Sequence, residues 1–422
     1  MLKRYVLKNG IRVAAQQLKE FRSVSIGVWI KAGSVYESEK EYGISHFIEH
    51  MLFKGTSRRS AADIASQMDG VGGNLNAFTA KECTCYYAKV TDKQLPLAVD
   101  ILADMVKNSV FDEAEMEKEK GVVCDEILMV EDSPEELVHD LLCAEVYNGT
   151  PLASQILGSE KNVRSFTRND ILSYMARRYM PNDILIACAG NFDEAQLIEL
   201  LEDAFSGYGE GSADVCENIV YNNGGRFSHI KKDIEQAHIC LGFPGYSLCE
   251  DDQFAMLVLN NIVGGSMSSR LFQTIREERG LAYSVYSYPS SYTSTGYFAL
   301  YAGTGEKQAA EVTKLMLDEV EKVLKCSVTS DELIRAKEQF KGSYILGQES
   351  TSARANSIGK SELLRNRTYT ESEVMEKIEK VDMAAMERII PYIFDFSRMN
   401  GALVSRDEKG AQEVRKLICR GN

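Results

Sequence analysis

The chain has 422 residues, of which 44% are hydrophobic and only seven are proline, so it has enough apolar material for two compact domains with a core each. Its formal net charge of −14 argues against a nucleic-acid partner, because binding to phosphates needs a basic surface, and it favours basic peptides instead. No segment is apolar enough to predict a membrane span or a signal peptide, which argues against a membrane partner. With ten cysteines and no secretory signal, we expect free thiols and a cytoplasmic location.

A predicted strand over Val24–Ile30 precedes a predicted helix over Ile44–Phe53, which carries the most informative residues of the chain. On a helix, side chains at positions i and i+4 project from the same face, so His46 and His50 can hold one metal ion between them. Glu49 lies beside such an ion, where it can take a proton from a water that the ion has made more acidic. The order H-x-x-E-H is the inverzincin signature.

A second interpretation of this motif is a solvated amphipathic helix on which Glu49 pairs with a lysine. Ser45 is expected to cap the helix, and most of its other residues are apolar. Two imidazoles without partners are unfavourable on such a helix, and a zinc ion would compensate for their burial. We therefore favour the metal site.

An exposed strand is predicted after the glycine-rich turn Gly70–Gly73 and before a strand over Thr84–Val90. An edge strand can accept an extended peptide through main-chain hydrogen bonds, with little regard to the sequence of that peptide. The alternative is an ordinary loop after a glycine turn. The candidate substrate-binding residues are Asn76, Ala77, Phe78 and Thr79.

Two histidines leave a hydrolytic zinc site one protein ligand short. The predicted helix over Glu115–Asp132 supplies the best candidate, Glu126, because its neighbours one turn away are apolar. A buried carboxylate without a partner is costly, so we expect Glu126 to bind a cation. Glu119 lies almost two turns earlier on the same face and could orient a ligand. In the alternative interpretation, both acids lie on the solvated side of the helix. The apolar neighbours are Val122, Val123, Met129 and Val130.

A glycine-rich stretch, Gly207–Gly225, divides the chain near its midpoint. The sequence on either side repeats one order of a strand, a helix and an aromatic-rich strand, which indicates two copies of one unit. In the second half these elements are Ala237–Phe243, Asp252–Val263 and Leu281–Tyr288. We expect a zinc-binding domain over 1–210, a linker over 211–225 and a structural, substrate-binding domain without metal ligands over 226–422. The Gly264–Arg270 loop lacks the ending of a phosphate-binding loop and is interpreted as a helix connection.

The spacing of His46, Glu49 and His50 with Glu126, which follows His50 by 76 residues (126 − 50 = 76), resembles that of the pitrilysin, or M16, metallopeptidases. Further stretches match the pattern of that family in the same order and extend the resemblance over essentially the whole chain. They are Gly27–Ser34, Asn76–Thr79 with Glu82, Thr84 and Tyr86, and Arg276–Tyr283. The chain is most similar to the bacterial processing-protease-like branch, which resembles the mitochondrial processing peptidase β subunit.

The resemblance implies an α+β protein of two similar α/β sandwich-like domains, each a mixed or antiparallel sheet backed by helices, as in the LuxS/MPP-like metallohydrolase fold. It also implies a zinc endopeptidase for unfolded or presequence-like peptides, with one zinc ion per chain. The implied metal ligands are His46, His50 and Glu126. The implied catalytic residues are Glu49, Glu119, Arg276 and Tyr283. In the family, the residues matching Arg276 and Tyr283 reach towards the substrate carbonyl and stabilise the tetrahedral intermediate.

The resemblance also bears on the working unit. The family closes a chamber from four such domains, so a chain of two domains is expected to form a homodimer, or else a heterodimer with a related subunit. Two other interpretations are a catalytically silent subunit and a metal-binding module without hydrolysis. A silent subunit typically lacks a ligand or the base, whereas this chain has both, and a binding module needs no spare carboxylate such as Glu49.

Overall fold

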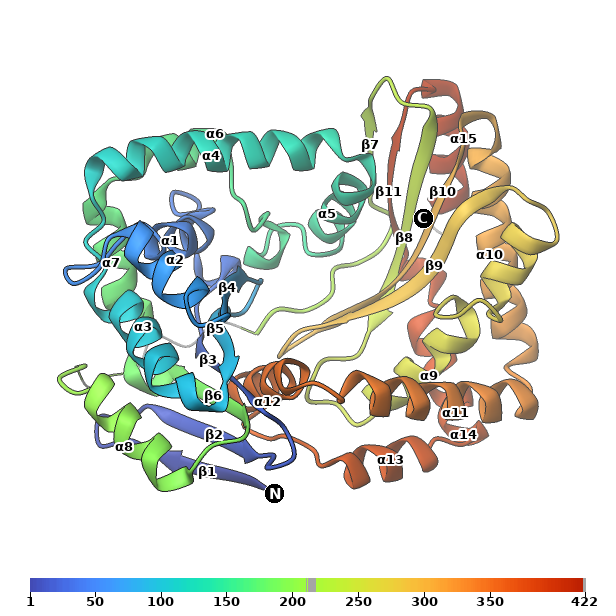
Figure 1. The fold of residues 1–422 in the computed structure, drawn as a ribbon. Coiled ribbons are helices and arrows are strands. Elements are labelled where there is room, and N and C mark those ends of the chain that lie inside the picture. The colour runs from blue at the N-terminus through green and yellow to red at the C-terminus, as the bar shows by residue number, and fades with distance from the viewer. Residues whose placement is uncertain (210, 212–217, 420–422) are drawn as a thin grey trace. The chain divides into compact units, whose positions relative to one another are not determined.

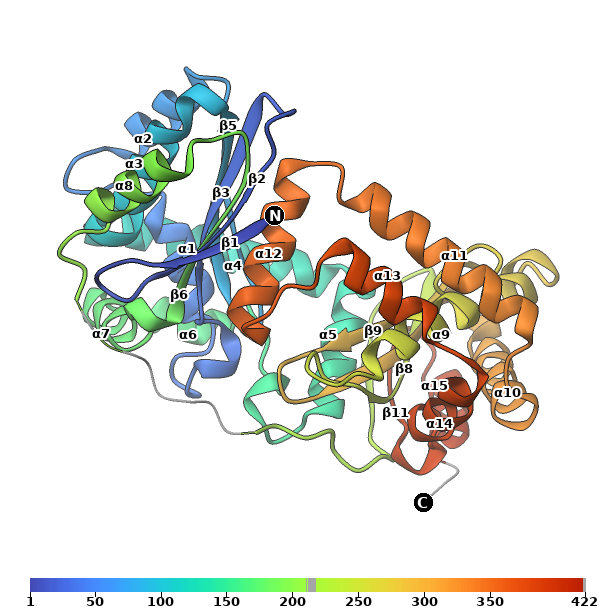
Figure 2. The same cartoon turned by 90° about the horizontal axis from the view of Figure 1, so that it is seen from below.

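The computed structural model describes residues 1–209, 211 and 218–419. Its contacts divide the chain into two compact units, and each unit has one sheet backed by helices (Figure 1, Figure 2). The predicted class of two similar α+β domains is confirmed. The first unit comprises Met1–Leu128, Ser154–Glu217 and Leu346–Thr368. The second unit comprises Met129–Ala153, Asn218–Ile345 and Tyr369–Asn422.

The sheet of the first unit has the strand order β1-β2-β6-β3-β5-β4 (Figure 1). β2 and β6 run parallel, and the other neighbouring strands run antiparallel. β3 is buried along almost its whole length because both faces of the sheet are covered there. β4 forms one edge, and its residues alternate between exposed and partly buried in its first half. The strands are β1 (Leu2–Val6), β2 (Arg12–Gln17), β3 (Ser23–Ile30), β4 (Asn74–Thr79), β5 (Thr84–Thr91) and β6 (Ile184–Gly190).

Helices on one face of this sheet enclose the apolar core of the first unit. Val24, Ile26 and Val28 of β3 point into this core together with Ile44 and Phe47 of α1 (Ile44–Leu52), the helix that carries His46 and His50. The helices predicted over 44–53 and 115–132 correspond to α1 and α4, and α4 continues through Gly121. The helices are α1 (Ile44–Leu52), α2 (Ala61–Asp69), α3 (Leu95–Asn108), α4 (Glu113–Asp132), α6 (Glu160–Ser165), α7 (Arg168–Arg178) and α8 (Glu194–Ala204).

The opposite face of the same sheet is covered by α12 (Thr351–Arg365), which comes from late in the sequence. Side chains alternate along a strand, so Ser25 and Trp29 of β3 point to this face rather than into the core. Ser25 Oγ lies 3.0 Å from Thr351 Oγ1. A Cβ atom at Gly359 would lie 2.2 Å from Trp29 Nε1, so the close approach of α12 requires glycine at this position.

The second unit repeats the plan of the first without β1. Its strand order, β7-β11-β8-β10-β9, corresponds to β2-β6-β3-β5-β4, and its parallel pair, β7 and β11, corresponds to β2 and β6. The strands are β7 (Phe227–Lys231), β8 (Gln236–Gly245), β9 (Ala282–Ser291), β10 (Gly296–Gly305) and β11 (Asn400–Ser405). The helices on its core face are α9 (Gln253–Val263), a π-helix (Phe272–Glu277), α10 (Ala309–Cys326), α11 (Ser330–Gly347), α13 (Glu371–Glu379), α14 (Met383–Ile393) and α15 (Glu408–Ile418).

α5 (Pro134–Val146) completes the second unit as α12 completes the first, because it packs against β8 and β11. Gly242 of β8 leaves room for it, since a Cβ atom there would lie 2.9 Å from Leu142 Cδ1. The compact units therefore differ from the continuous domains predicted at 1–210 and 226–422. Composition marks a linker, but it carries no signal for which sheet a helix will cover. Residues 212–217 of the predicted linker lie outside the described part of the chain.

Candidate metal centre and active site

The start of α1 is fixed by a buried carboxylate. Glu37 accepts hydrogen bonds from the main-chain N–H of Gly43, at 2.8 Å, and of Ser45, at 2.9 Å, and its burial raises the pKa of Glu37 to about 7. Gly43 has a φ of 96°, and a Cβ atom there would lie 2.6 Å from the oxygen of Leu157, so the turn requires glycine. The predicted cap by Ser45 was wrong, because its Oγ lies 2.8 Å from the hydroxyl of Tyr174 instead.

His46 and His50 lie one turn apart on α1, with their ring centroids 4.6 Å apart. Glu126 of α4 completes the cluster, since its Oε2 lies 3.6 Å from His46 Nε2 and 3.4 Å from His50 Nε2. Burial, and then the neighbouring His50, lower the pKa of His46 to about 3, so this imidazole is neutral and can offer a lone pair. The three donor atoms lie within 4.8 Å of one another. Two imidazole nitrogens and one carboxylate oxygen fit a hydrolytic zinc site.

Glu119 and Lys54 support the cluster behind His50. His50 Nδ1 donates to Glu119 Oε1 at 2.8 Å, and Lys54 Nζ lies 2.5 Å from Glu119 Oε2. Burial raises the pKa of Glu119, but the hydrogen bonds from His50 and Lys54 outweigh this effect and hold the pKa below its ordinary value. Because Nδ1 is bonded to a carboxylate, His50 presents Nε2 to the cluster. Lys54 was not predicted from the sequence.

The burial argument that selected Glu126 from the sequence was wrong. The Glu126 side chain is 41% exposed, and among its apolar neighbours Val122 is 51% exposed and Met129 is 72% exposed. α4 packs on the core through Val123 and Ile127, so Glu126 lies at the border of the buried face. From this border its carboxylate reaches the two histidines, and Glu126 remains the candidate third ligand for this reason instead.

We expect the substitution Lys54→Met to lower the affinity for zinc by roughly tenfold, at the low end of the effect of residues that orient a metal ligand. Without the ammonium group, Glu119 is held from one side only and orients His50 less firmly. Competition with a chromogenic chelator measures the affinity. Lys118→Met is the matched control, because Lys118 is an exposed lysine of α4, the helix that carries Glu119, and it pairs with Glu115 instead. An unchanged affinity in Lys54→Met would contradict a supporting role.

Glu49 lies on α1 between the two histidines but is not one of the three converging donors. Its Oε2 accepts a hydrogen bond of 2.5 Å from Thr79 Oγ1. Burial raises the pKa of Glu49, and the hydrogen bond from Thr79 opposes this effect. The structure thus brings a partly buried carboxylate next to the histidines, and its role as a general base stays a prediction.

β4 is the last strand of its sheet, as predicted, and it carries the four candidate substrate residues. Asn76 Oδ1 accepts a hydrogen bond of 2.8 Å from the main-chain N–H of Ala77. The ring of Phe78 packs edge-on against Trp29, with the centroids 5.5 Å apart. Thr79 directs its hydroxyl to Glu49, a contact that the sequence did not indicate. Substrate binding by this strand stays a prediction.

Arg276 and Tyr283 belong to the second unit. The Arg276 guanidinium lies 4.7 Å from the ring centroid of Phe272 and 4.8 Å from that of Tyr283. Tyr283 lies near the start of β9 and is 76% exposed. The two predicted residues therefore form a stacked pair at the end of the π-helix, and their catalytic role stays a prediction.

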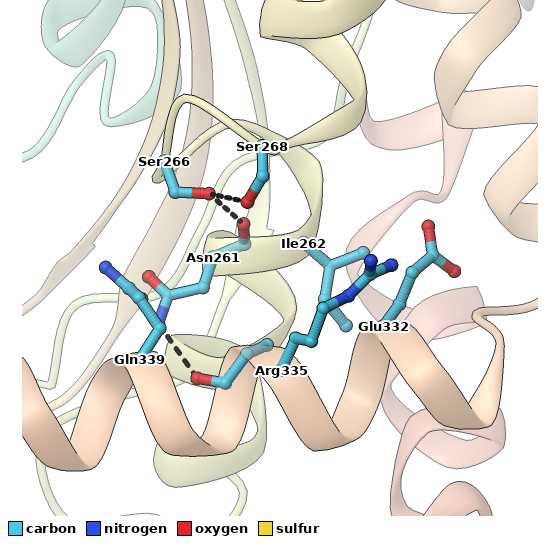
Figure 3. A pocket seen from close by; sticks show the side chains of 8 residues that line it. Asn261, Ile262, Ser266, Ser268, Glu332, Arg335 and Gln339 are labelled. Atoms are coloured by element: carbon cyan, nitrogen blue, oxygen red, sulfur yellow. Dashed lines mark hydrogen bonds between the residues drawn. The ribbon is translucent and has the colours of Figure 1, made fainter.

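A small hollow in the second unit lies between α9 and α11 (Figure 3). The hydroxyls of Ser266 and Ser268 face it from the loop after α9. Ser266 Oγ lies 3.2 Å from Ser268 Oγ and also donates to the oxygen of Asn261, at 3.2 Å. These hydroxyls bond to each other and to the end of α9, and the segment Gly264–Arg270 connects α9 to the π-helix, in agreement with the sequence-based interpretation.

Two family models match consecutive parts of the chain. Residues 12–160 match insulinase (peptidase family M16), and residues 165–340 match the peptidase M16 inactive domain. The first match covers the histidines and Glu126, and the second begins after them. Both models describe parts of one peptidase family. The chain belongs to peptidase family M16, and the resemblance inferred from the motifs is confirmed.

Similar proteins support the same class. YmxG of Bacillus subtilis, an uncharacterized zinc protease, is 43% identical over 395 residues, which cover 93% of this chain and 96% of that protein. An uncharacterized zinc protease of Streptomyces coelicolor is 40% identical over 397 residues, covering 92% of this chain and 86% of that protein. A protease from Helicobacter pylori shares the fold with a TM-score of 0.90 at 21% identity, over 96% of this chain and 99% of that one. Family membership and the names of the Bacillus and Streptomyces relatives support a zinc metallopeptidase.

One further expectation concerned membranes. Within the residues that the structure describes, no helix combines the length and the apolar character needed to cross a bilayer. The cytoplasmic location expected from the cysteine content stays a prediction.

Proposed function

We propose that the chain is a zinc-dependent endopeptidase that hydrolyses peptide bonds in unfolded peptides, including basic, presequence-like ones. The observation that carries this proposal is the convergence of His46, His50 and Glu126 next to the carboxylate of Glu49. A silent subunit is disfavoured because all four residues are present. A simple metal-binding module is disfavoured because Glu49 has no function in it.

Each residue has a separate role in the proposed reaction. Zinc, when bound by His46, His50 and Glu126, supplies a Lewis acid and lowers the pKa of water. Glu49 accepts a proton from the attacking water and later passes it to the leaving amine. Glu119 keeps His50 oriented through their hydrogen bond. The free edge of β4 holds the peptide extended by main-chain hydrogen bonds.

The direct test is digestion of a mixed peptide pool by the purified protein, followed by mass spectrometry. Unfolded peptides should be cut internally, the activity should vanish with a chelator, and added zinc should restore it. Peptides that stay intact, or cleavage that a chelator does not affect, would overturn the proposed function. Comparing basic and acidic peptides of equal length in the same pool tests the preference expected from the net charge of −14.

We expect Tyr283→Phe to lower kcat by about a hundredfold with unchanged zinc content, the cost of losing one donor to the oxyanion. Arg276 and Tyr283 are proposed to donate to the carbonyl oxygen as it gains charge, and phenylalanine removes the donor while keeping the ring stacked. Steady-state kinetics on one peptide measures the effect. Tyr392→Phe is the control, because Tyr392 is a partly exposed tyrosine of α14 in the same unit. A wild-type rate in Tyr283→Phe would mean that Arg276 and Tyr283 have only a structural role.

The working unit is proposed to be a homodimer that encloses a chamber. The resemblance is to a family that builds its chamber from four such units, and this chain supplies two of them, so two chains would complete a chamber. A two-fold dimer is the commonest closed homo-oligomer. Light scattering should give about twice the mass of one chain, and folded proteins should survive while unfolded peptides are cut. A fully active monomer would contradict the chamber. An inactive protein that gains activity with a related subunit would favour the heterodimer.

A further inference from the structure

Thr79 ends the edge strand β4, at the point where this strand meets α1. From the sequence, Thr79 was predicted to bind substrate together with its neighbours on the strand. In the structure, its hydroxyl donates a hydrogen bond to Glu49 Oε2 at 2.5 Å. Thr84, its partner across the β4–β5 pair, directs its hydroxyl elsewhere, to the main-chain oxygen of Ala32 at 2.9 Å. Of these two paired threonines, Thr79 is the one that contacts Glu49.

This hydrogen bond restricts the rotation of the Glu49 carboxylate. Glu49 has three rotatable side-chain bonds, and within the described part of the chain Thr79 is the one hydrogen-bond partner of its carboxylate. With Oε2 held by the hydroxyl, Oε1 is the oxygen left to take a proton. A general base must hold one oxygen within hydrogen-bond reach of the water that it deprotonates, so a fixed orientation has direct value for the rate.

We propose that Thr79 is a positioning residue that fixes the rotation of the Glu49 carboxylate and ties it to the strand that receives the peptide. The inference rests on the proposed function of Glu49 as the base. β4 offers its free edge to the substrate, and the same strand supplies the hydroxyl that holds the base. One rigid element therefore sets the position of both the scissile bond and the group that activates water.

The test compares Thr79→Val, which keeps the shape and removes the hydroxyl, with Thr79→Ser, which keeps the hydroxyl. Thr79→Val should lower kcat by roughly tenfold to a hundredfold, the effect of losing a residue that orients a reacting group, with KM and zinc content unchanged. Thr79→Ser should restore most of the rate. Thr91→Val, at the exposed end of β5, is the matched control and should behave as wild type. A raised KM at unchanged kcat would assign Thr79 to substrate binding and overturn the proposal.

A double-mutant cycle separates positioning from a general structural effect. In a Glu49→Gln background, Thr79→Val should cause little further loss of rate, because the group that it positions no longer acts as a base. Equal losses in both backgrounds would overturn the proposal.

Crystal structures supply a readout that does not depend on activity. The Glu49 carboxylate should turn in Thr79→Val and keep its orientation in Thr79→Ser, and an unchanged carboxylate in Thr79→Val would contradict the inference. A wild-type protein without chelator-sensitive cleavage would instead overturn the proposed function, so the two failures are distinguishable.

Discussion

Glu49→Gln should lose nearly all peptide hydrolysis, with a fall in kcat on the order of a hundredfold to ten-thousandfold, while it keeps its zinc. The carboxamide has almost the shape of the carboxylate and can still accept the hydrogen bond from Thr79. It is too weak a base to take the proton from water. Because Glu49 is not among the three converging donors, its replacement leaves the metal site intact.

The measurement pairs steady-state kinetics with zinc content from elemental mass spectrometry on the same preparation. Glu113→Gln is the control, because Glu113 is an exposed acid in the first turn of α4 and loses the same charge. Substantial hydrolysis by Glu49→Gln would rule out Glu49 as the general base. Loss of zinc in this variant would instead make Glu49 a ligand.

Glu126→Gln should lose zinc and, with it, hydrolysis. The Glu126 carboxylate is the only anionic donor among the three converging groups, and its replacement by a neutral amide leaves two imidazole nitrogens to hold a divalent cation. His50→Ala should have the same result because it removes a nitrogen donor. Equilibrium dialysis against a weak chelator measures zinc per chain, and Glu113→Gln should keep one zinc ion.

The comparison with Glu119 makes this prediction sharper. Glu119→Gln should retain more zinc than Glu126→Gln, because Glu119 contacts His50 Nδ1 on the side away from the cluster. Full zinc occupancy and full activity in Glu126→Gln would rule out Glu126 as a ligand. Glu119 would then be the next candidate.

The parts of the site that the sequence predicted are those encoded locally. His46 and His50 share a helix, so their spacing alone places them on one face. The edge strand was predicted because the turn and the strands that define it are neighbours in sequence. Glu126 was identified for the wrong physical reason: the apolar residues near it in sequence include exposed ones, because only one side of α4 packs on the core.

The parts that the sequence could not predict depend on contacts between distant segments. Nothing in the spacing of Lys54 and Glu119, or of Glu49 and Thr79, indicates that their side chains meet. The capping by Glu37 was missed because Ser45 stands closer to the start of the helix in sequence. Such pairs arise from tertiary packing, which local propensity and periodicity do not encode.

The late position of α12 in the sequence affects the order of synthesis. The unit that carries the histidines has one face of its sheet covered by residues 351–365, so Trp29 and its neighbours on β3 stay uncovered while the ribosome makes most of the chain. Domains usually fold as they emerge, N-terminal first, but this unit cannot complete its packing before α12 has left the exit tunnel. The nascent chain therefore exposes a sheet face for most of its synthesis, which is the kind of surface that chaperones bind.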